Sequence, residues 1–169
     1  MAKHSHDPQV GDALSPPSIE NSNGFYQLDR FSSRDNMGYL LKRAWTVLAT
    51  AVEQEVAHLD ITYPQFVVMI KLHEGSCSTA AELAREVNTD TGAMTRLLGR
   101  MECKGLIRRL RSSEDRRVFK LAITESGQAI FDRAIVDGIN VLNRYFKDFS
   151  TEEMTQLNHM LRRVIHRDA

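Results

Sequence analysis

From residue 36 onward, apolar residues recur mostly at three- and four-residue steps, which is the period of amphipathic helices. The first such stretch, residues 36–59, is apolar over a wider stripe than a surface helix of a small monomer needs. Two more helical stretches, divided by a capping box at Ser150 and Glu153, fill residues 124–167. We therefore expect these first and last helices to pack against a partner as well as against their own core.

Between these regions, capping boxes and glycines predict three further helices. Thr62 with Gln65 and Thr79 with Glu82 have the spacing at which each side chain satisfies a free backbone N–H of the other residue. Gly75 follows the first of these helices. The pattern predicts helices over about 62–74, 79–87 and 91–104, the last two joined by a three-residue turn.

After residue 105 the hydrophobic period shortens from that of a helix to that of a strand. Residues 106–111 and 118–123 are β-compatible, and a polar loop of residues 112–117 lies between them. This indicates a hairpin with a charged tip. The predicted fold is mainly α with a small β-hairpin wing, in which residues 34–169 form a single domain.

Residues 1–33 differ from the rest, since they hold three of the four prolines and little apolar periodicity. We interpret them as a flexible tail. The longest apolar run, residues 66–70, is far shorter than the roughly 20 residues of a membrane span, and residues 1–7 lack the apolar segment of a secretory signal. Two cysteines are too few for a disulfide framework. We expect a cytoplasmic protein.

The charge distribution changes the picture more than the net charge, which is zero. Residues 93–120 hold nine basic and three acidic side chains, a net +6, so the rest of the chain carries −6. A single basic region on an acidic chain is typical of a protein with one face on nucleic-acid phosphates. A solvated charged surface is the alternative.

The short helix, turn and longer helix over residues 79–104 match the helix-turn-helix arrangement. The longer helix needs one apolar side for packing and one polar side for the major groove. Small residues near its start would let a phosphate approach the helix N-terminus, and arginine is well suited to guanine. The candidate DNA-contacting residues of this helix are Thr91, Gly92, Thr95, Arg96 and Arg100.

The hairpin tip supplies a second candidate contact. An aspartate two positions before an arginine can hold the guanidinium by a bidentate pair, and arginine suits a narrow, negative minor groove. The candidate residues of the tip are Ser113, Asp115, Arg116 and Arg117. The alternative is a surface hairpin with locally paired charges.

Four motifs, "MTRLLGRME" at 94–102, "KGLI" at 104–107, "EDRR" at 114–117 and "LAITESG" at 121–127, occur in this order. Together they resemble the MarR family of winged helix-turn-helix transcription regulators, from about residue 36 to the C-terminus. The resemblance implies an obligate dimer in which helices 36–59 and 124–167 interlock. It implies a winged helix-turn-helix over about 62–123 and a wing arginine at Arg117. At the end of the first strand, Leu110 and Arg111 replace a frequent Arg-Pro pair.

The resemblance also implies a small-molecule pocket between the dimerisation helices and the DNA-binding lobe. A ligand there would change the spacing of the two recognition helices and weaken DNA binding. Aromatic rings beside an arginine suit a small aromatic carboxylate or its thioester. The candidate pocket residues are Tyr39, Arg43, Tyr63, Phe66, Ile70 and His73. Phe66 and Ile70 could equally be core residues, and His73 a surface residue.

Three other functions compete with a ligand-released repressor. Cys77, which precedes a predicted helix, could sense oxidants, whereas we expect Cys103 to be a buried apolar residue. A winged helix used only for protein contacts would not need so many basic residues in one region. Catalysis is not expected, and neither is a cofactor or metal, because metal-binding spacings, nucleophile motifs and phosphate loops are missing. The predicted function is therefore a homodimeric regulator of transcription that binds a near-palindromic operator.

Overall fold

The computed structural model describes residues 24–27, 30–111 and 119–167. The chain divides into two compact units, residues 1–42 and 43–169. Most of the predicted tail, residues 1–33, lies outside the described residues, as does the hairpin loop. Among the helices that are described, none is both long and apolar enough to cross a membrane.

In the first unit, the described residues organise the start of α1 (Met37–Val56). The Tyr26 hydroxyl accepts a hydrogen bond from the Met37 N–H at 2.7 Å, and Asn36 Oδ1 accepts one from the Tyr39 N–H at 2.9 Å. Phe25 packs edge-on against Tyr26, with ring centroids 5.2 Å apart, yet remains 92% exposed. These contacts satisfy two of the N–H groups that a helix start leaves without partners.

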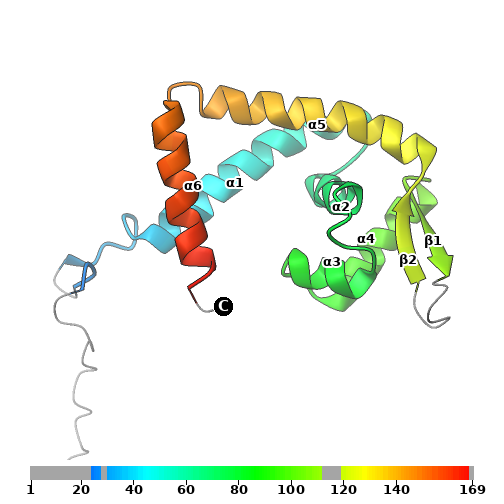
Figure 1. Cartoon of the computed structure of the whole chain (residues 1–169), viewed down its shortest axis with the longest axis horizontal. Helices are drawn as coiled ribbons and strands as arrows, with labels where there is room; N and C mark the ends of the chain where they lie inside the picture. The colour runs from blue at the N-terminus through cyan, green and yellow to red at the C-terminus, as the bar shows by residue number, and fades with distance from the viewer. Residues whose placement is uncertain (1–23, 28–29, 112–118, 168–169) are drawn as a thin grey trace, which may run out of the picture. The chain divides into compact units, whose positions relative to one another are not determined.

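The second unit contains the rest of α1 and all later elements (Figure 1). The elements after α1 are η2 (Ala57–Leu59), α2 (Tyr63–His73), α3 (Ala80–Glu86), α4 (Thr91–Cys103), β1 (Ile107–Arg111), β2 (Phe119–Ile123), α5 (Glu125–Tyr145) and α6 (Thr151–Ile165). The predicted fold class, mainly α with one hairpin, is confirmed.

Local capping accounts for where several helices begin. The Thr79 hydroxyl accepts from the Glu82 N–H at 3.2 Å, and Glu82 accepts from the Thr79 N–H at 3.0 Å. Ser150 and Glu153 form the same reciprocal pair, at 3.2 and 2.8 Å. Asp90 caps α4 by accepting from the Ala93 N–H at 2.8 Å. The boxes read from the sequence therefore set the starts of α3 and α6.

The core of the second unit joins one side of each of α1 to α5. Its fully buried side chains are Val56, Val68, Met69, Leu83, Met94, Leu98, Met101, Ile107 and Val141. α5 approaches its neighbours closely at two glycines. A Cβ on Gly138 would lie 3.2 Å from the Phe66 ring, and one on Gly127 would lie 2.0 Å from the Leu106 carbonyl oxygen. The two glycines therefore allow α5 to dock on α2 and on the start of the hairpin.

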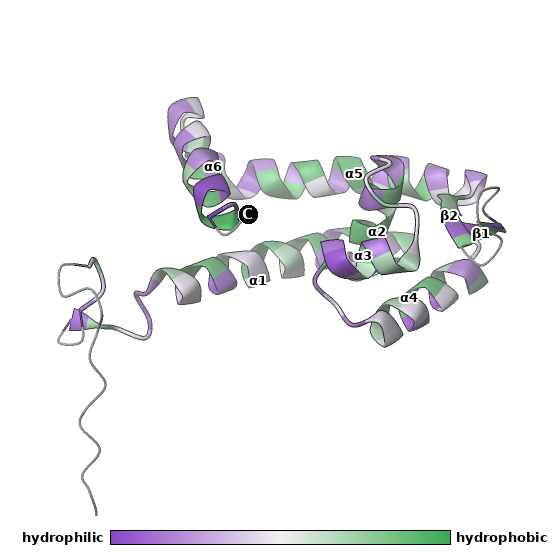
Figure 2. Ribbon diagram, turned by 60° about the horizontal axis from the view of Figure 1, so that its bottom comes forward, coloured by the Kyte–Doolittle hydropathy of each residue, from purple (hydrophilic) through white to green (hydrophobic). Residues whose placement is uncertain are grey.

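Apolar side chains remain exposed along α5 and α6. α6 has no buried residue, although it presents Met160, Val164 and Ile165, which are 52%, 62% and 72% exposed. On α5, Val136 and Ile139 are 54% and 49% exposed. Figure 2 shows apolar residues alternating with polar ones along both helices. Packing within the described part of the second unit therefore leaves the apolar stripe of α6 uncovered.

Candidate nucleic-acid interface

The turn between α3 and α4 fixes how the second helix sits on the first. Asn88 adopts a left-handed conformation with φ 50°, and the Thr89 N–H donates to the Ala84 carbonyl at 2.9 Å. Asp90 then starts α4. Because Leu83 and Leu98 are buried in the same core, the two helices pack as a helix-turn-helix (Figure 1).

The opposite side of α4 carries the residues predicted to contact DNA, and all of them are exposed: Thr91, Gly92, Thr95, Arg96 and Arg100. Met94, Leu98 and Met101 on the packing side are at most 1% exposed. The helix therefore separates one apolar and one polar side along its length, as an element that enters the major groove requires.

The first turn of α4 lacks a side chain at Gly92, and two charged groups lie next to that position. A Cβ on Gly92 would lie 3.1 Å from Asp90 Oδ1 and 3.5 Å from Arg96 Nη1. The guanidinium of Arg96 therefore reaches back beside Gly92 toward the helix N-terminus. The Thr95 hydroxyl donates to the Thr91 carbonyl at 2.8 Å and keeps its lone pairs for another partner. This end of α4 combines the capping carboxylate of Asp90 with a cation, a hydroxyl and backbone N–H groups.

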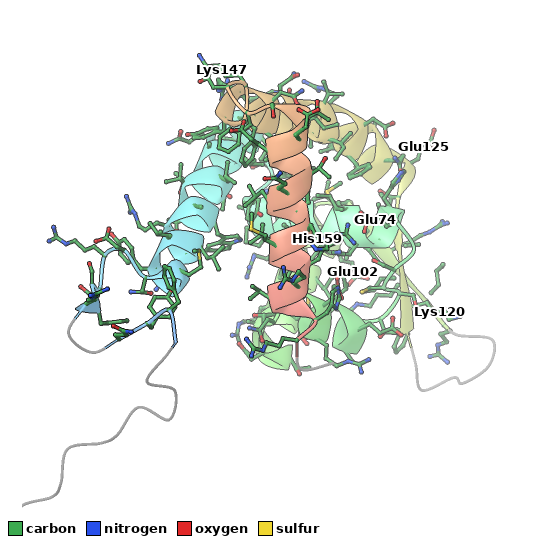
Figure 3. The ribbon with its side chains drawn as sticks, turned by 60° about the vertical axis from the view of Figure 1, so that its left-hand side comes forward. Glu74, Glu102, Lys120, Glu125, Lys147 and His159 are labelled. Atoms are coloured by element: carbon green, nitrogen blue, oxygen red, sulfur yellow. The ribbon has the colours of Figure 1, made fainter. Side chains whose placement is uncertain are left out.

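The hairpin lies directly after α4 and continues the basic surface. β1 and β2 are antiparallel, and their register pairs Ile107 with Ile123 at one end and Arg111 with Phe119 at the other. Four cations of the strands are exposed: Arg108, Arg109, Arg111 and Lys120. Lys120 extends outward from β2 (Figure 3).

Not every cation of this region is available for DNA. Arg109 Nε lies 3.2 Å from Glu102 Oε2, which ties β1 to the end of α4. Lys104 Nζ lies 3.0 Å from Asp60 Oδ2 and donates to the Asp60 carbonyl at 2.5 Å. These ion pairs hold the last turn of α4 in place. A count of basic residues in the sequence could not show that Lys104 is paired, because its partner Asp60 is distant in the chain.

The tip of the wing, with its candidate residues Ser113, Asp115, Arg116 and Arg117, lies outside the described residues. Its point of departure is described, because Arg111 and Phe119 are the last paired residues before the loop. β2 leads into α5 at its other end. The loop therefore leaves the hairpin at the end remote from α5.

The residues predicted to line a ligand pocket have different surroundings. Phe66 is 4% exposed and packs on Phe131, with ring centroids 6.4 Å apart, so it is a core residue. His73 stacks on Phe131 at 4.5 Å between ring centroids. Ile70 packs against the core, whereas Arg43 is exposed. Tyr39, also exposed, belongs to the first unit.

Tyr63 has an aromatic neighbour that sequence reasoning did not select. The Trp45 ring on α1 lies edge-on to the Tyr63 ring, with centroids 6.4 Å apart, and Trp45 remains 61% exposed. The Tyr63 N–H also donates to the Glu53 carboxylate on α1. No signal in the sequence indicated Trp45, because the helical period places it on the opposite side of α1 from Arg43.

Neither cysteine has the exposure that its suggested role in the sequence analysis requires. Cys103, expected to be buried, is exposed, because it lies in the last turn of α4 away from the packing side of Met101. Cys77 is 6% exposed and belongs to the core. A sensing thiol needs access to the oxidant, so the burial of Cys77 disfavours a sensory role. No cluster of metal-ligating side chains occurs within residues 24–27, 30–111 and 119–167.

Sequence comparison places this region among known regulators. The model of the MarR family matches residues 61–119. The multiple antibiotic resistance protein MarR of Escherichia coli is 30% identical over 115 residues, which cover 68% of this chain and 80% of that protein. The HTH-type transcriptional repressor IacR of Pseudomonas putida is 27% identical over 154 residues, 91% of this chain and 92% of that protein.

Solved structures give the same result for the fold. A mutant of E. coli MarR, complexed with operator DNA, superposes with a TM-score of 0.69 and 28% identity, covering 75% of this chain and 91% of that chain. CouR from Rhodococcus jostii RHA1, bound to p-coumaroyl-CoA, superposes with a TM-score of 0.70 and 22% identity, covering 78% of this chain and 93% of that one. The helix-turn-helix and hairpin described above are thus the fold of these winged-helix proteins.

Proposed function

This chain belongs to the MarR family of DNA-binding transcriptional regulators, and we propose that it is a cytoplasmic homodimeric repressor that a small ligand releases from its operator. The observation that carries the proposal is the exposed polar side of α4, followed at once by a basic hairpin. The protein acts by binding alone, without catalysis or a cofactor.

In this proposal α4 reads the major groove. The N–H groups of Thr91 and Gly92 and the hydroxyl of Thr95 bind phosphate, while Arg96 and Arg100 reach base edges or the backbone. The wing, with Ser113, Asp115, Arg116 and Arg117, follows the adjacent minor groove, where Asp115 holds Arg117 in place. Arg96 supports this assignment most directly, because it lies beside the open first turn of α4.

The exposed apolar stripe of α6 supports the homodimer. A monomer would leave Met160, Val164 and Ile165 in water, whereas a second copy would bury them. A two-fold dimer presents two α4 helices to DNA, so its operator is a near-palindrome. The half-sites then lie about one helical turn apart, roughly 10 base pairs.

The ligand is an aromatic carboxylate or its thioester. Arg43 supplies the cation, and Tyr63 supplies aromatic surface at the start of α2. His73 stands at the other end of α2, where it stacks on Phe131. The binding of p-coumaroyl-CoA by CouR is an example of such a compound on the same fold.

Fluorescence anisotropy on the DNA upstream of the protein's own gene tests this function, with a panel of aromatic acids and their thioesters added afterwards. We expect tight, salt-sensitive binding that one compound reverses. Binding that no compound reverses would refute the ligand class and keep the regulator. An absence of binding at low salt, on genomic fragments as well, would favour a protein-interaction module.

A further inference from the structure

We propose that Arg111 makes a phosphate contact of its own, and that the ring of Phe119 holds its guanidinium in place for it. The inference rests on the proposed binding of DNA by α4 and the wing. Arg111 is the last residue of β1, and Phe119 is the first residue of β2. The two are cross-strand partners at the end of the hairpin from which the wing loop departs.

The contact between the two side chains fits a positioned cation. Arg111 Cζ lies 6.0 Å from the centroid of the Phe119 ring, within the range of cation–π attraction. A guanidinium over a ring keeps the N–H groups at its edge, which can pair with the oxygens of a phosphate. The ring also restricts the rotamers of the long Arg111 side chain, so that less conformational entropy is lost on binding.

Phe119 is much more exposed than the apolar residues of the hairpin that pack in the core. It is 45% exposed, while Leu121 and Ile107 in the same hairpin are 8% and 2% exposed. A phenylalanine at the exposed end of a two-stranded sheet contributes little burial, but it provides a surface on which a cation can rest. Phe119 is thus a positioning residue for Arg111.

Arg111 also differs from the other cations of β1. Arg109 is tied to Glu102, as described above. Arg108 pairs with Ala122 and, by the strand alternation, points to the other side of the hairpin. Where the MarR pattern often has Arg-Pro, this chain has Leu110 and Arg111, so its arginine stands one residue later and on the other side of the strand. A cation at position 111, opposite Phe119, is therefore a feature of this sequence.

The salt dependence of DNA binding measures this contact. Each phosphate contact adds about 0.9 to the slope of log affinity against log salt, and a dimer carries two copies of Arg111. Loss of Arg111 should therefore lower the slope by about 2. Between 50 and 200 mM salt, the variant's affinity should fall by a factor roughly tenfold smaller than that of the wild type.

The experiment compares the full-length wild type with Arg111→Ala, Arg111→Gln, Phe119→Leu and the control Arg133→Ala, which removes an exposed cation from α5. Anisotropy is measured at four salt concentrations on an operator duplex and on an unrelated duplex. We expect both Arg111 variants to lower the slope equally on the two duplexes. Phe119→Leu should weaken binding with the slope retained, and Arg133→Ala should match the wild type.

Wild-type slope and affinity in Arg111→Gln would overturn the inference while leaving the regulator intact. A loss confined to the operator duplex would also overturn it, because Arg111 would then read a base. If the wild type itself bound neither duplex at low salt, the proposed function would be wrong instead. Equal midpoints of thermal unfolding establish that the variants are folded. Arg111→Gln, which removes the charge but keeps the first three side-chain carbons, decides the matter if Arg111→Ala is unstable.

Discussion

At the scale of single residues, the cations of one basic region have different roles. Arg109 and Lys104 are paired with Glu102 and Asp60, and they stabilise the junction of α4 with its surroundings. Arg96 reaches back over the open turn at Gly92. Charge in the sequence therefore locates the DNA-binding region, but the ion pairs decide which of its cations remain for DNA.

Arg96 and Arg117 should respond differently to truncation. Arg96→Ala should change which bases are preferred, with a loss of about 1–3 kcal/mol at the affected position, because a bidentate contact to a base is removed. Arg117→Ala should weaken binding to all sequences similarly, because the proposed contact of Arg117 is with the minor groove and backbone. Affinity measured on a set of singly mutated operators distinguishes the two. Unchanged affinity and preference in both variants would contradict the assigned interface.

Gly127 is the residue at which a methyl group should cost most. Gly127→Ala places a Cβ 2.0 Å from the Leu106 carbonyl oxygen, so α5 or the hairpin must shift. We expect a loss of about 1–3 kcal/mol or more in the free energy of unfolding, measured in urea. Gly99→Ala is the matched control, since a Cβ there meets nothing within 4 Å. It should leave stability unchanged or raise it by up to about 1 kcal/mol; equal losses in both variants would refute the close approach.

At the scale of elements, the signals local in sequence predicted the structure well. The box of Thr79 with Glu82 and the stop at Gly75 lie within one or two helical turns of the ends they mark, so both can be predicted without knowing the fold. The ion pair of Lys104 with Asp60 and the burial of Cys77 in the core both depend on residues that are distant in the sequence. The exposure of Cys103 was predicted wrongly because the last residue of a helix can face either side. The tip residues and the pocket residues remain predictions.

The capping box of α3 should make stability depend on acid. Hydrogen bonds from the backbone N–H groups of Ser78 and Thr79 hold the pKa of Glu82 below its ordinary value of 4.5. A carboxyl whose pKa is lowered by folding stabilises the native state above its unfolded pKa, and this stabilisation is lost as pH falls through the folded value. Glu82→Gln keeps an acceptor but does not titrate.

The wild type should therefore lose more stability than Glu82→Gln as pH falls from about 5 toward 3. Urea unfolding followed at several pH values measures this difference. Parallel pH profiles of the two proteins would show that the charge of Glu82 contributes nothing to the cap. Above about pH 6 the difference in stability between the two should be constant.

At the scale of the whole molecule, the proposed dimer rests on apolar residues that remain exposed in the described part of the second unit. α6 buries none of its own residues, although three of its apolar side chains are more than half exposed. Helical stability in proteins comes mainly from packing of the apolar face, so we expect a second copy to cover α6. The apolar period of this helix is plain in the sequence, but only the fold shows that nothing in the described part of the second unit covers it.

Charged substitutions on α6 test the dimer. Met160→Glu and Val164→Glu each place a carboxylate in the apolar stripe and should shift the protein toward monomers, measured by light scattering after size exclusion. His159→Glu is the control, because His159 is exposed on α6 (Figure 3) and the helical period turns it well away from Met160 and Val164. Operator affinity should fall along with the dimer. Dimers that persist in both stripe variants would place the interface elsewhere.

The most direct test of the central claim is a footprint of the full-length protein on the DNA upstream of its gene, at two salt concentrations. The account predicts protection of one near-palindromic site, in two half-sites about 10 base pairs apart, that weakens as salt rises. Protection that is absent at both salt concentrations, or spread evenly over the fragment, would contradict sequence-specific reading of DNA by α4 and the wing.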